Sequence, residues 1–185
     1  KIDSIQVLYF KSSEEKQGLD LVNQYKKFLA DLNEVQTRYE KESKGMLASH
    51  FIRASAQYNA ESPHKEPDSY MDAIKEHFFD NMDLSDEELS HSTFVSDRLH
   101  DYVFYLNQAE DRVSENALQK DAIEKALQWI DKDMELLGSF ESDLLEAYLL
   151  NENVEMINFV NDNYRFYLEK RYCLDKNRIK CFTLS

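Results

Sequence analysis

Residues 19–42 read LDLVNQYKKFLADLNEVQTRYEKE, and this stretch decides the fold class. Its apolar residues recur at alternating spacings of four and three, which places them on one face of a helix. They are Leu21, Tyr25, Phe28, Leu32, Val35 and Tyr39. Val22 and Leu29 widen this face beyond a strict coiled-coil seam. We therefore expect one long amphipathic helix that packs into a bundle.

The composition extends this expectation to the rest of the chain. Only three glycines and two prolines occur among 185 residues, so the residues that supply the tight corners of β-proteins are scarce. Pro63 and Pro67 mark a loop, and Gly45 and Gly138 are expected to end helices. The sequence predicts an all-α fold, an antiparallel bundle of about seven helices.

The N-terminal stretch is the exception to the helical pattern. Residues 5–10 read IQVLYF, which is β-branched and aromatic and is typical of a short strand or of the remnant of a β-region. We therefore divide the chain into an entry segment, residues 1–11, a helical domain, residues 12–170, and a basic C-terminal tail, residues 171–185.

The net charge argues against a nucleic-acid partner, and the short apolar runs argue against a membrane span. With 22 basic and 36 acidic side chains the formal net charge is −14, and such a surface repels a phosphate backbone. No run approaches the roughly 18 apolar residues that a membrane span requires. We expect neither a nucleic-acid partner nor a transmembrane segment.

Motifs that carry chemistry are weak in this sequence. The Glu-x-x-His spacing of di-metal bundles occurs at Glu61–His64 and Glu88–His91, but the first pair lies in the proline-containing loop and the second in a short turn. The chain has no G-x-S-x-G nucleophile motif and no glycine-rich phosphate loop. The sequence therefore predicts no catalytic residue, no metal site and no cofactor.

Residues 77–86 carry a family resemblance. They read HFFDNMDLSD and, together with Leu89, Leu99 and Tyr102, resemble a signature in the helical region of bacterial cell-envelope thiol-disulfide oxidoreductases, upstream of a thioredoxin-like domain. That catalytic domain needs a C-x-x-C motif, which this chain lacks. The resemblance implies a helical accessory region and a periplasmic or envelope location. Its signature residues here are His77, Phe78, Phe79, Asp80, Asn81, Asp83, Leu84, Ser85 and Asp86.

A structural role is expected for the signature. The two phenylalanines should anchor a helix end in the core, Asp80 and Asn81 should turn the chain, and Asp83 or Ser85, the latter paired with Glu88, should cap the next short helix. Cys173 and Cys181 are either free thiols or one structural disulfide, and the oxidising envelope that the resemblance implies favours the disulfide.

Three functional hypotheses follow. The first is a non-catalytic accessory domain that positions or shields a thioredoxin-like domain or recognises its client. The second is a self-contained helical binding protein of the envelope, with an exposed apolar patch or groove between helices. The third is a metal-dependent helical-bundle enzyme, which needs converging ligands that the sequence does not show.

Overall fold

The computed structural model describes residues 2–90, 92–130 and 133–174. These residues form nine α-helices and one π-helical turn, and no β-strand lies among them. The predicted all-α class is therefore confirmed, with more helices than the seven expected. The chain divides into two compact units, unit 1 from Lys1 to His91 and unit 2 from Ser92 to Ser185.

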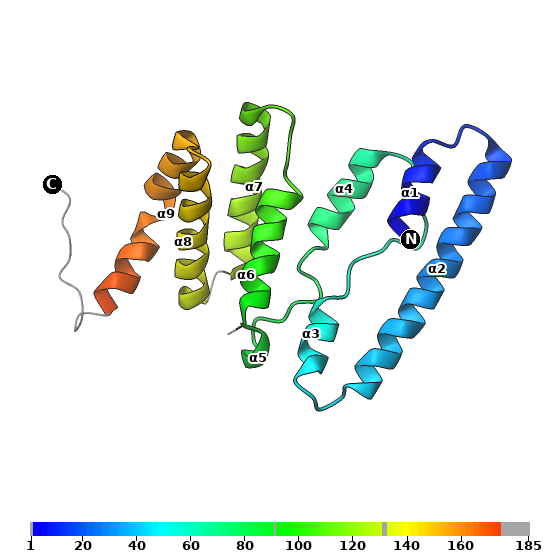
Figure 1. Cartoon of the computed structure of the whole chain (residues 1–185), viewed down its shortest axis with the longest axis horizontal. Coiled ribbons are helices and arrows are strands. Elements are labelled where there is room, and N and C mark those ends of the chain that lie inside the picture. Colours follow the sequence, from blue (N-terminus) through cyan, green and yellow to red (C-terminus); the bar gives the residue numbers. More distant parts are fainter. Residues whose placement is uncertain (1, 91, 131–132, 175–185) are drawn as a thin grey trace. The chain divides into compact units, whose positions relative to one another are not determined.

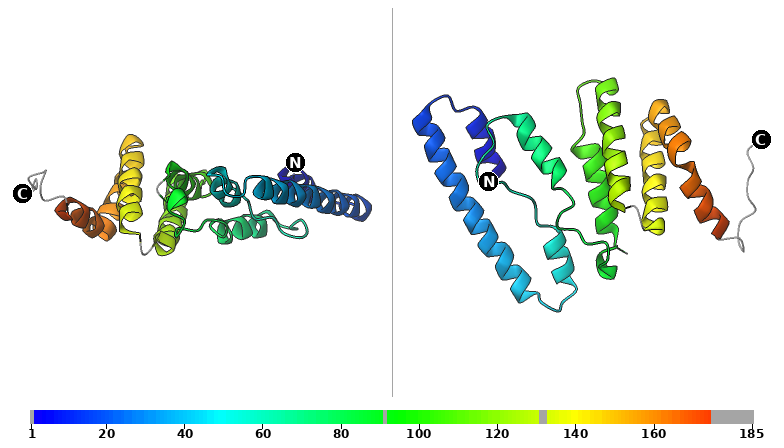
Figure 2. Two further views of the ribbon diagram at one scale, coloured as in Figure 1. Left: turned by 90° about the horizontal axis from the view of Figure 1, so that it is seen from below. Right: turned by 180° about the vertical axis from the view of Figure 1, so that it is seen from behind.

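Unit 1 is organised around one long helix, α2 (Figure 1). The helices of this unit are α1 (Ile2–Phe10), α2 (Glu15–Glu42), α3 (Ala48–Ala54), α4 (Pro67–Glu76) and α5 (Glu87–Ser90). The views of Figures 1 and 2 agree in placing α1 beside the first half of α2, while α3 contacts α2 further along the chain. Gly45 turns the chain after α2 with a φ of +81°, which glycine adopts without a Cβ clash, as predicted.

The core of unit 1 lies between α1 and α2. Its buried members are Ile2 and Ile5 of α1 and Leu21 and Tyr25 of α2. Half-buried apolar side chains surround these four residues, namely Tyr9, Phe28 and Leu29. The apolar face predicted for residues 19–42 is thus used for packing, but only its first half is buried.

The strand expected at residues 5–10 is wrong, because these residues belong to helix α1. In a strand, neighbouring side chains point to opposite faces. Here the neighbours Ile5 and Gln6 are both buried, whereas the neighbours Val7 and Leu8 are both exposed. Burial of one helical face against α2 outweighs the β-propensity of the segment, and the expected entry segment is part of the unit 1 core.

Unit 2 has a helical core of its own. It contains α6 (Thr93–His100), the π-helical turn η1 (Asp101–Tyr105), α7 (Arg112–Ile130), α8 (Met134–Leu150) and α9 (Val154–Leu174). In η1 the N–H of Leu106 donates to the carbonyl of Asp101, five residues back. The buried side chain of Asn107 then donates to the carbonyl of Tyr102 at 2.6 Å, which closes the turn. The largest side chains buried in unit 2 include Leu99, Ile123, Ile130, Leu144, Tyr148 and Met156.

The prediction that Gly138 ends a helix is also wrong. The chain breaks earlier, after Ile130, and Gly138 lies inside α8. Asp133 begins α8 by accepting hydrogen bonds from the N–H groups of Glu135 and Leu136 at 3.1 and 3.0 Å. The apolar rhythm continues across this break because both helices face the same core, so the spacing alone does not reveal the cap.

None of the helices in the described part of the chain combines the length and the apolar character needed to cross a membrane.

Candidate functional site

The signature segment, residues 77–86, connects α4 to α5 in unit 1. His77 follows the last residue of α4, and the ring of Tyr58 stacks on its imidazole with 4.1 Å between ring centroids. Nδ1 of the same imidazole lies 2.7 Å from a carboxylate oxygen of Asp80. The end of α4 is therefore held by the segment that precedes this helix and by the turn that follows it.

Asn81 and Met82 fix the middle of the signature segment. Nδ2 of Asn81 donates a hydrogen bond of 2.8 Å to the carbonyl oxygen of Ala56. Met82 is buried, whereas Phe78 and Phe79, the predicted core anchors, are half-buried and meet edge to face. The anchor prediction is corrected accordingly. The reason is that α4 ends at Glu76. Phe78 and Phe79 therefore lie beyond the helix, and helical spacing does not direct their rings into the core.

Two aspartates shape the end of the signature segment. The hydroxyl and the N–H of Ser85 both donate to one carboxylate oxygen of Asp83, at 2.7 and 2.9 Å, and these bonds lower the pKa of Asp83. Asp86, directly before α5, accepts the N–H of Leu89 at 3.4 Å. The predicted capping pair of Ser85 and Glu88 is therefore wrong, because Asp83 engages Ser85 and Asp86 takes the capping position.

Asp86 also joins the signature segment to α3. Its second carboxylate oxygen lies 2.5 Å from Nδ1 of His50, and this hydrogen bond lowers the pKa of Asp86. Leu84, between the two aspartates, is half-buried. The polar contacts of the segment thus run to α3 and to the residues that follow α3. The segment therefore links these parts of unit 1 to the end of α4.

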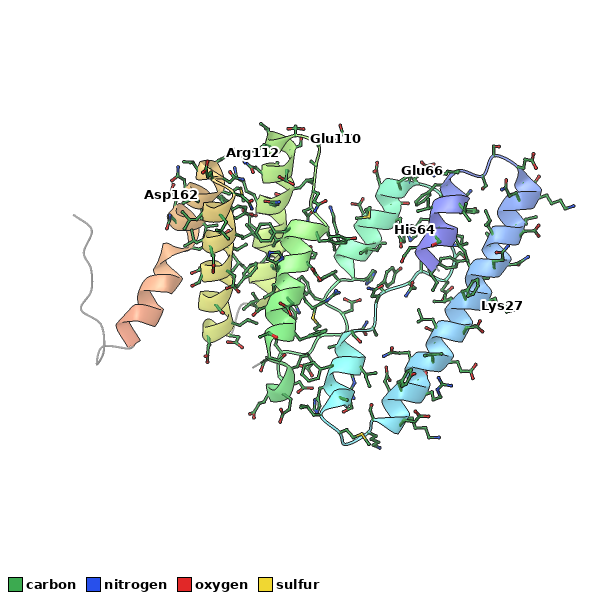
Figure 3. All side chains as sticks on the ribbon, in the orientation of Figure 1. Lys27, His64, Glu66, Glu110, Arg112 and Asp162 are labelled. Atoms are coloured by element: carbon green, nitrogen blue, oxygen red, sulfur yellow. The ribbon has the colours of Figure 1, made fainter. Side chains whose placement is uncertain are left out.

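A second set of contacts ties α1 to the loop before α4 and to α4 itself. The fully buried side-chain amide of Gln6 donates to the carbonyl of His64 at 2.8 Å and accepts the N–H of His64 at 2.9 Å. The hydroxyl of Tyr70 donates to Asp3 at 2.6 Å. Burial is the main reason that the pKa of Tyr70 is raised, and this hydrogen bond raises the pKa further. Figure 3 shows His64 between α1 and α4. The loop is therefore a fixed part of unit 1.

A solvent-open hollow of about 530 Å³ lies where the turn between α1 and α2 meets the start of α4. Its lining combines aromatic and aliphatic side chains with hydroxyls, three carboxylates and one amine. These residues are Tyr9, Phe10, Ser12, Ser13, Glu14, Glu15, Gly18, Leu19, Val22, Lys65 and Glu66. This hollow is not predictable from the sequence, because its walls come from segments about fifty residues apart.

The second half of α2 carries an apolar face that unit 1 leaves open. We call Leu32, Val35 and Tyr39 the α2 stripe, and Phe28, which precedes it on the same face, packs against the core of unit 1. Phe28 is half-buried, whereas Leu32, Val35 and Tyr39 are exposed by 42%, 38% and 49%. This stripe continues the face whose first residues, Leu21 and Tyr25, are buried against α1.

The two flanks of the α2 stripe differ. On one flank the amide of Gln36 donates to the carbonyl of Ile52 in α3 at 2.9 Å, so this flank faces α3. On the other flank, one turn of helix to either side of Val35, lie the exposed side chains of Asp31 and Arg38. The guanidinium of Arg38 lies 5.3 Å from the centroid of the Tyr39 ring. The stripe is therefore closed on one side and charged on the other.

Unit 2 contains a polar network between α7 and the start of α9, in which Asn116 and Asn153 are buried. Asn116 accepts a hydrogen bond from Asn153 and donates one to Glu155, both at 2.8 Å. Glu155 also pairs with Lys120, and the hydrogen bonds from Lys120 and Asn116 lower the pKa of Glu155. The network fixes α9 against α7, which is a structural role that the sequence analysis did not anticipate.

The structure describes only some of the residues weighed for metal binding and redox chemistry. Across the part of the chain that the structure describes, no three histidine, cysteine, aspartate or glutamate side chains converge as ligands. Of the two Glu-x-x-His spacings, the first has His64 in the contact with α1, and His91 of the second lies outside the described residues. The predicted disulfide of Cys173 and Cys181 also falls outside the side chains that the structure describes.

Comparison with known proteins gives no match. The chain matches no protein-family model, no curated protein and no solved structure.

Proposed function

We propose that the chain is a non-catalytic helical interaction domain of the bacterial cell envelope, built from antiparallel helices, which works with a thioredoxin-like protein. The observation that carries the interaction role is the α2 stripe. A face that is buried in its first half and open in its second half exposes Leu32, Val35 and Tyr39 in one row. Such a row is the surface that an amphipathic partner helix covers in helix-in-groove recognition.

The physical advantage of covering the α2 stripe is removal of apolar surface from water. Each Å² of apolar surface that a partner buries contributes about 25 cal/mol, so complete cover of three partly exposed side chains contributes a few kcal/mol in total. Scattered single apolar residues need no partner, but neighbours on one helical face form a contiguous patch. In the turn after α2, Met46 and Leu47 are also exposed, by 59% each.

The association with a thioredoxin-like protein rests on the signature of residues 77–86. In the structure these residues connect parts of unit 1 by hydrogen bonds, and a segment that stabilises a fold is expected to recur wherever that fold is used. The signature therefore supports a shared helical domain, with the redox chemistry supplied by a thioredoxin-like domain on the same chain or by a separate protein.

Site-specific photo-crosslinking tests the interaction role. A benzophenone amino acid introduced at Val35, in the α2 stripe, is compared with the same group at Thr37, which is exposed on the opposite face of α2. We expect an adduct in the envelope fraction from position 35 and none from position 37. Adducts of equal yield at both positions, or none at position 35, would contradict the proposal.

The identity of the adduct tests the thioredoxin association. The adducts and the endogenous product are identified by mass spectrometry. An adduct with a thioredoxin-like protein, or an endogenous product well above 21.9 kDa that includes such a domain, supports the association. An endogenous product near that mass whose adduct is an unrelated protein would instead make the chain a self-contained binding protein.

A further inference from the structure

We infer that Met46 is a reversible oxidation site, at which a peroxide converts the thioether to a sulfoxide. Met46 lies in the turn between α2 and α3, outside the α2 stripe, and 59% of its surface is exposed. Oxidation of a methionine requires that the oxidant reach its sulfur, so exposure selects the side chains that react. The inference does not depend on a partner for the α2 stripe.

The methionines of the chain differ widely in exposure. The sequence has five, and the structure describes the side chains of four of them. Met46 is the most exposed of these four, Met71 of α4 is half-buried, and Met82 and Met156 are exposed by only 5% and 0%. A buried thioether meets peroxide only after the structure around it opens. The fold therefore ranks the four sites by reactivity.

The turn that carries Met46 is held by its backbone. The N–H of Met46 donates to the carbonyl of Ser43 at 2.9 Å, and the carbonyl of Met46 accepts the N–H and the hydroxyl of Ser49 at 3.0 and 2.8 Å. The space beside the turn is open, because a Cβ added at Gly45 would meet no atom beyond its chain neighbours within 4 Å. A change at the Met46 sulfur therefore leaves the bonds of the turn in place.

Hydrogen peroxide is sufficient as the oxidant. A lone pair of the Met46 sulfur attacks one peroxide oxygen, so that an S–O bond forms while the O–O bond breaks. The departing hydroxide takes the proton of the transferred oxygen and leaves as water, and the sulfur has given two electrons to the peroxide. Methionine sulfoxide reductases reverse the change. Two thiols then supply the electrons and become a disulfide, and the oxygen leaves as water.

The effect of the added oxygen on the fold depends on the site. A sulfoxide is polar, so at Met82 or Met156 it would place an oxygen among buried apolar side chains and destabilise the fold. At Met46 the oxygen faces water. Met46 can therefore gain and lose an oxygen while unit 1 stays folded.

Peptide mapping of the full chain after timed exposure to excess hydrogen peroxide tests the ranking. Trypsin releases Met46, Met71 and Met82 in separate peptides, and a second protease that cleaves after glutamate separates Met134 from Met156. The mass of one added oxygen reports the rate at each site. We expect Met46 to react about tenfold or more faster than Met82 and Met156, with Met71 between them. Equal rates at Met46 and the two buried sites, or a faster reaction at Met71, would overturn the inference.

Two variants and a denatured sample serve as controls. Met46→Leu should lose the fast uptake of oxygen, whereas Met71→Leu should keep it. In concentrated urea the rates at all sites should converge, and a ranking that persists there would show that the fold is not its cause.

Reversibility is tested on the singly oxidised chain. Its circular dichroism should match that of the untreated chain, and methionine sulfoxide reductases for both sulfoxide epimers should restore Met46. Loss of helix with the first oxygen, or a sulfoxide at Met46 that the reductases leave in place, would contradict a reversible site.

Discussion

The side chain of Gln6 pairs with the backbone of His64 through two hydrogen bonds, at 2.8 and 2.9 Å, as one strand pairs with another in a sheet. Gln6 is fully buried, so water does not reach either polar atom. The pair bridges α1 and the loop before α4, whose residues lie 58 positions apart. The position of the loop before α4 therefore depends on one amide side chain of α1.

Gln6→Ala should lower the free energy of unfolding by about 1–3 kcal/mol, because it removes the partner of the N–H and the carbonyl of the half-buried His64. Urea denaturation followed by circular dichroism measures the loss. Gln24→Ala, at an exposed position of α2, is the matched control and should change stability by less than about 0.5 kcal/mol. Equal effects of the two substitutions would contradict a structural role for the Gln6 pair.

Asp86→Asn should destabilise unit 1 at pH 7 and have little effect near pH 2. The hydrogen bond to His50 lowers the pKa of Asp86 in the folded state, so the charged carboxylate stabilises the fold above the unfolded value of about 3.9. This contribution disappears as the pH falls through the folded pKa. Denaturation midpoints at both pH values test the prediction, with Asp72→Asn, at an exposed position of α4, as the control. A pH-independent effect of Asp86→Asn would contradict it.

Asn116→Ala should destabilise unit 2 by about 1–3 kcal/mol, because it removes the acceptor of the buried Asn153 amide and one of the two donors to Glu155. Gln128→Ala, also on α7 but exposed, provides the amide control. Hydrogen exchange of the α9 backbone measures the loss locally, and α9 should exchange faster in the first variant only. Unchanged exchange in α9 would show that the network does not hold this helix.

Tyr148 makes unit 2 sensitive to alkali. Its hydroxyl donates to Gln119 at 2.9 Å, and burial raises the pKa of Tyr148 above its ordinary value. Its contribution to stability is therefore complete below the unfolded pKa of about 10 and is lost as the pH rises above it.

We expect Tyr148→Phe to cost about 1–2 kcal/mol at pH 7, because the oxygen of Gln119 loses its donor, and to flatten the decline in stability above pH 10. Thermal unfolding between pH 7 and 11 measures both effects. Tyr105→Phe, at a side chain that is 72% exposed, should change neither. A wild-type pH profile retained in Tyr148→Phe would contradict the assignment.

The fold class follows from local sequence pattern, but two element boundaries do not. The spacing of residues 21–39 is a property of α2 itself, and it predicts this helix correctly. The helical state of residues 5–10 depends on burial against α2, which their β-branched composition does not encode. The break between α7 and α8 depends on the side chain of Asp133, which an apolar rhythm does not register.

The long-range contact of the signature segment could not be predicted from the sequence for a different reason. Asp80, Asp83 and Ser85 bond to near neighbours, so their turn is visible in the sequence. The partner of Asp86 is His50, which lies 36 residues away and is fixed only by the folded chain. The exposure of Val35 is likewise invisible, because the same spacing describes a covered face and an open one.

The ties of α1 to the chain near residue 64 have a consequence for the order of folding. During synthesis α1 leaves the ribosome before the rest of unit 1, and the partners of Gln6 and Asp3 emerge 58 and 67 residues later. Until then α1 has only its apolar contacts with α2, and each later contact closes a long loop at an entropic cost. Although α1 comes first in the sequence of unit 1, its hydrogen bonding is therefore complete only after Tyr70 of α4 has emerged.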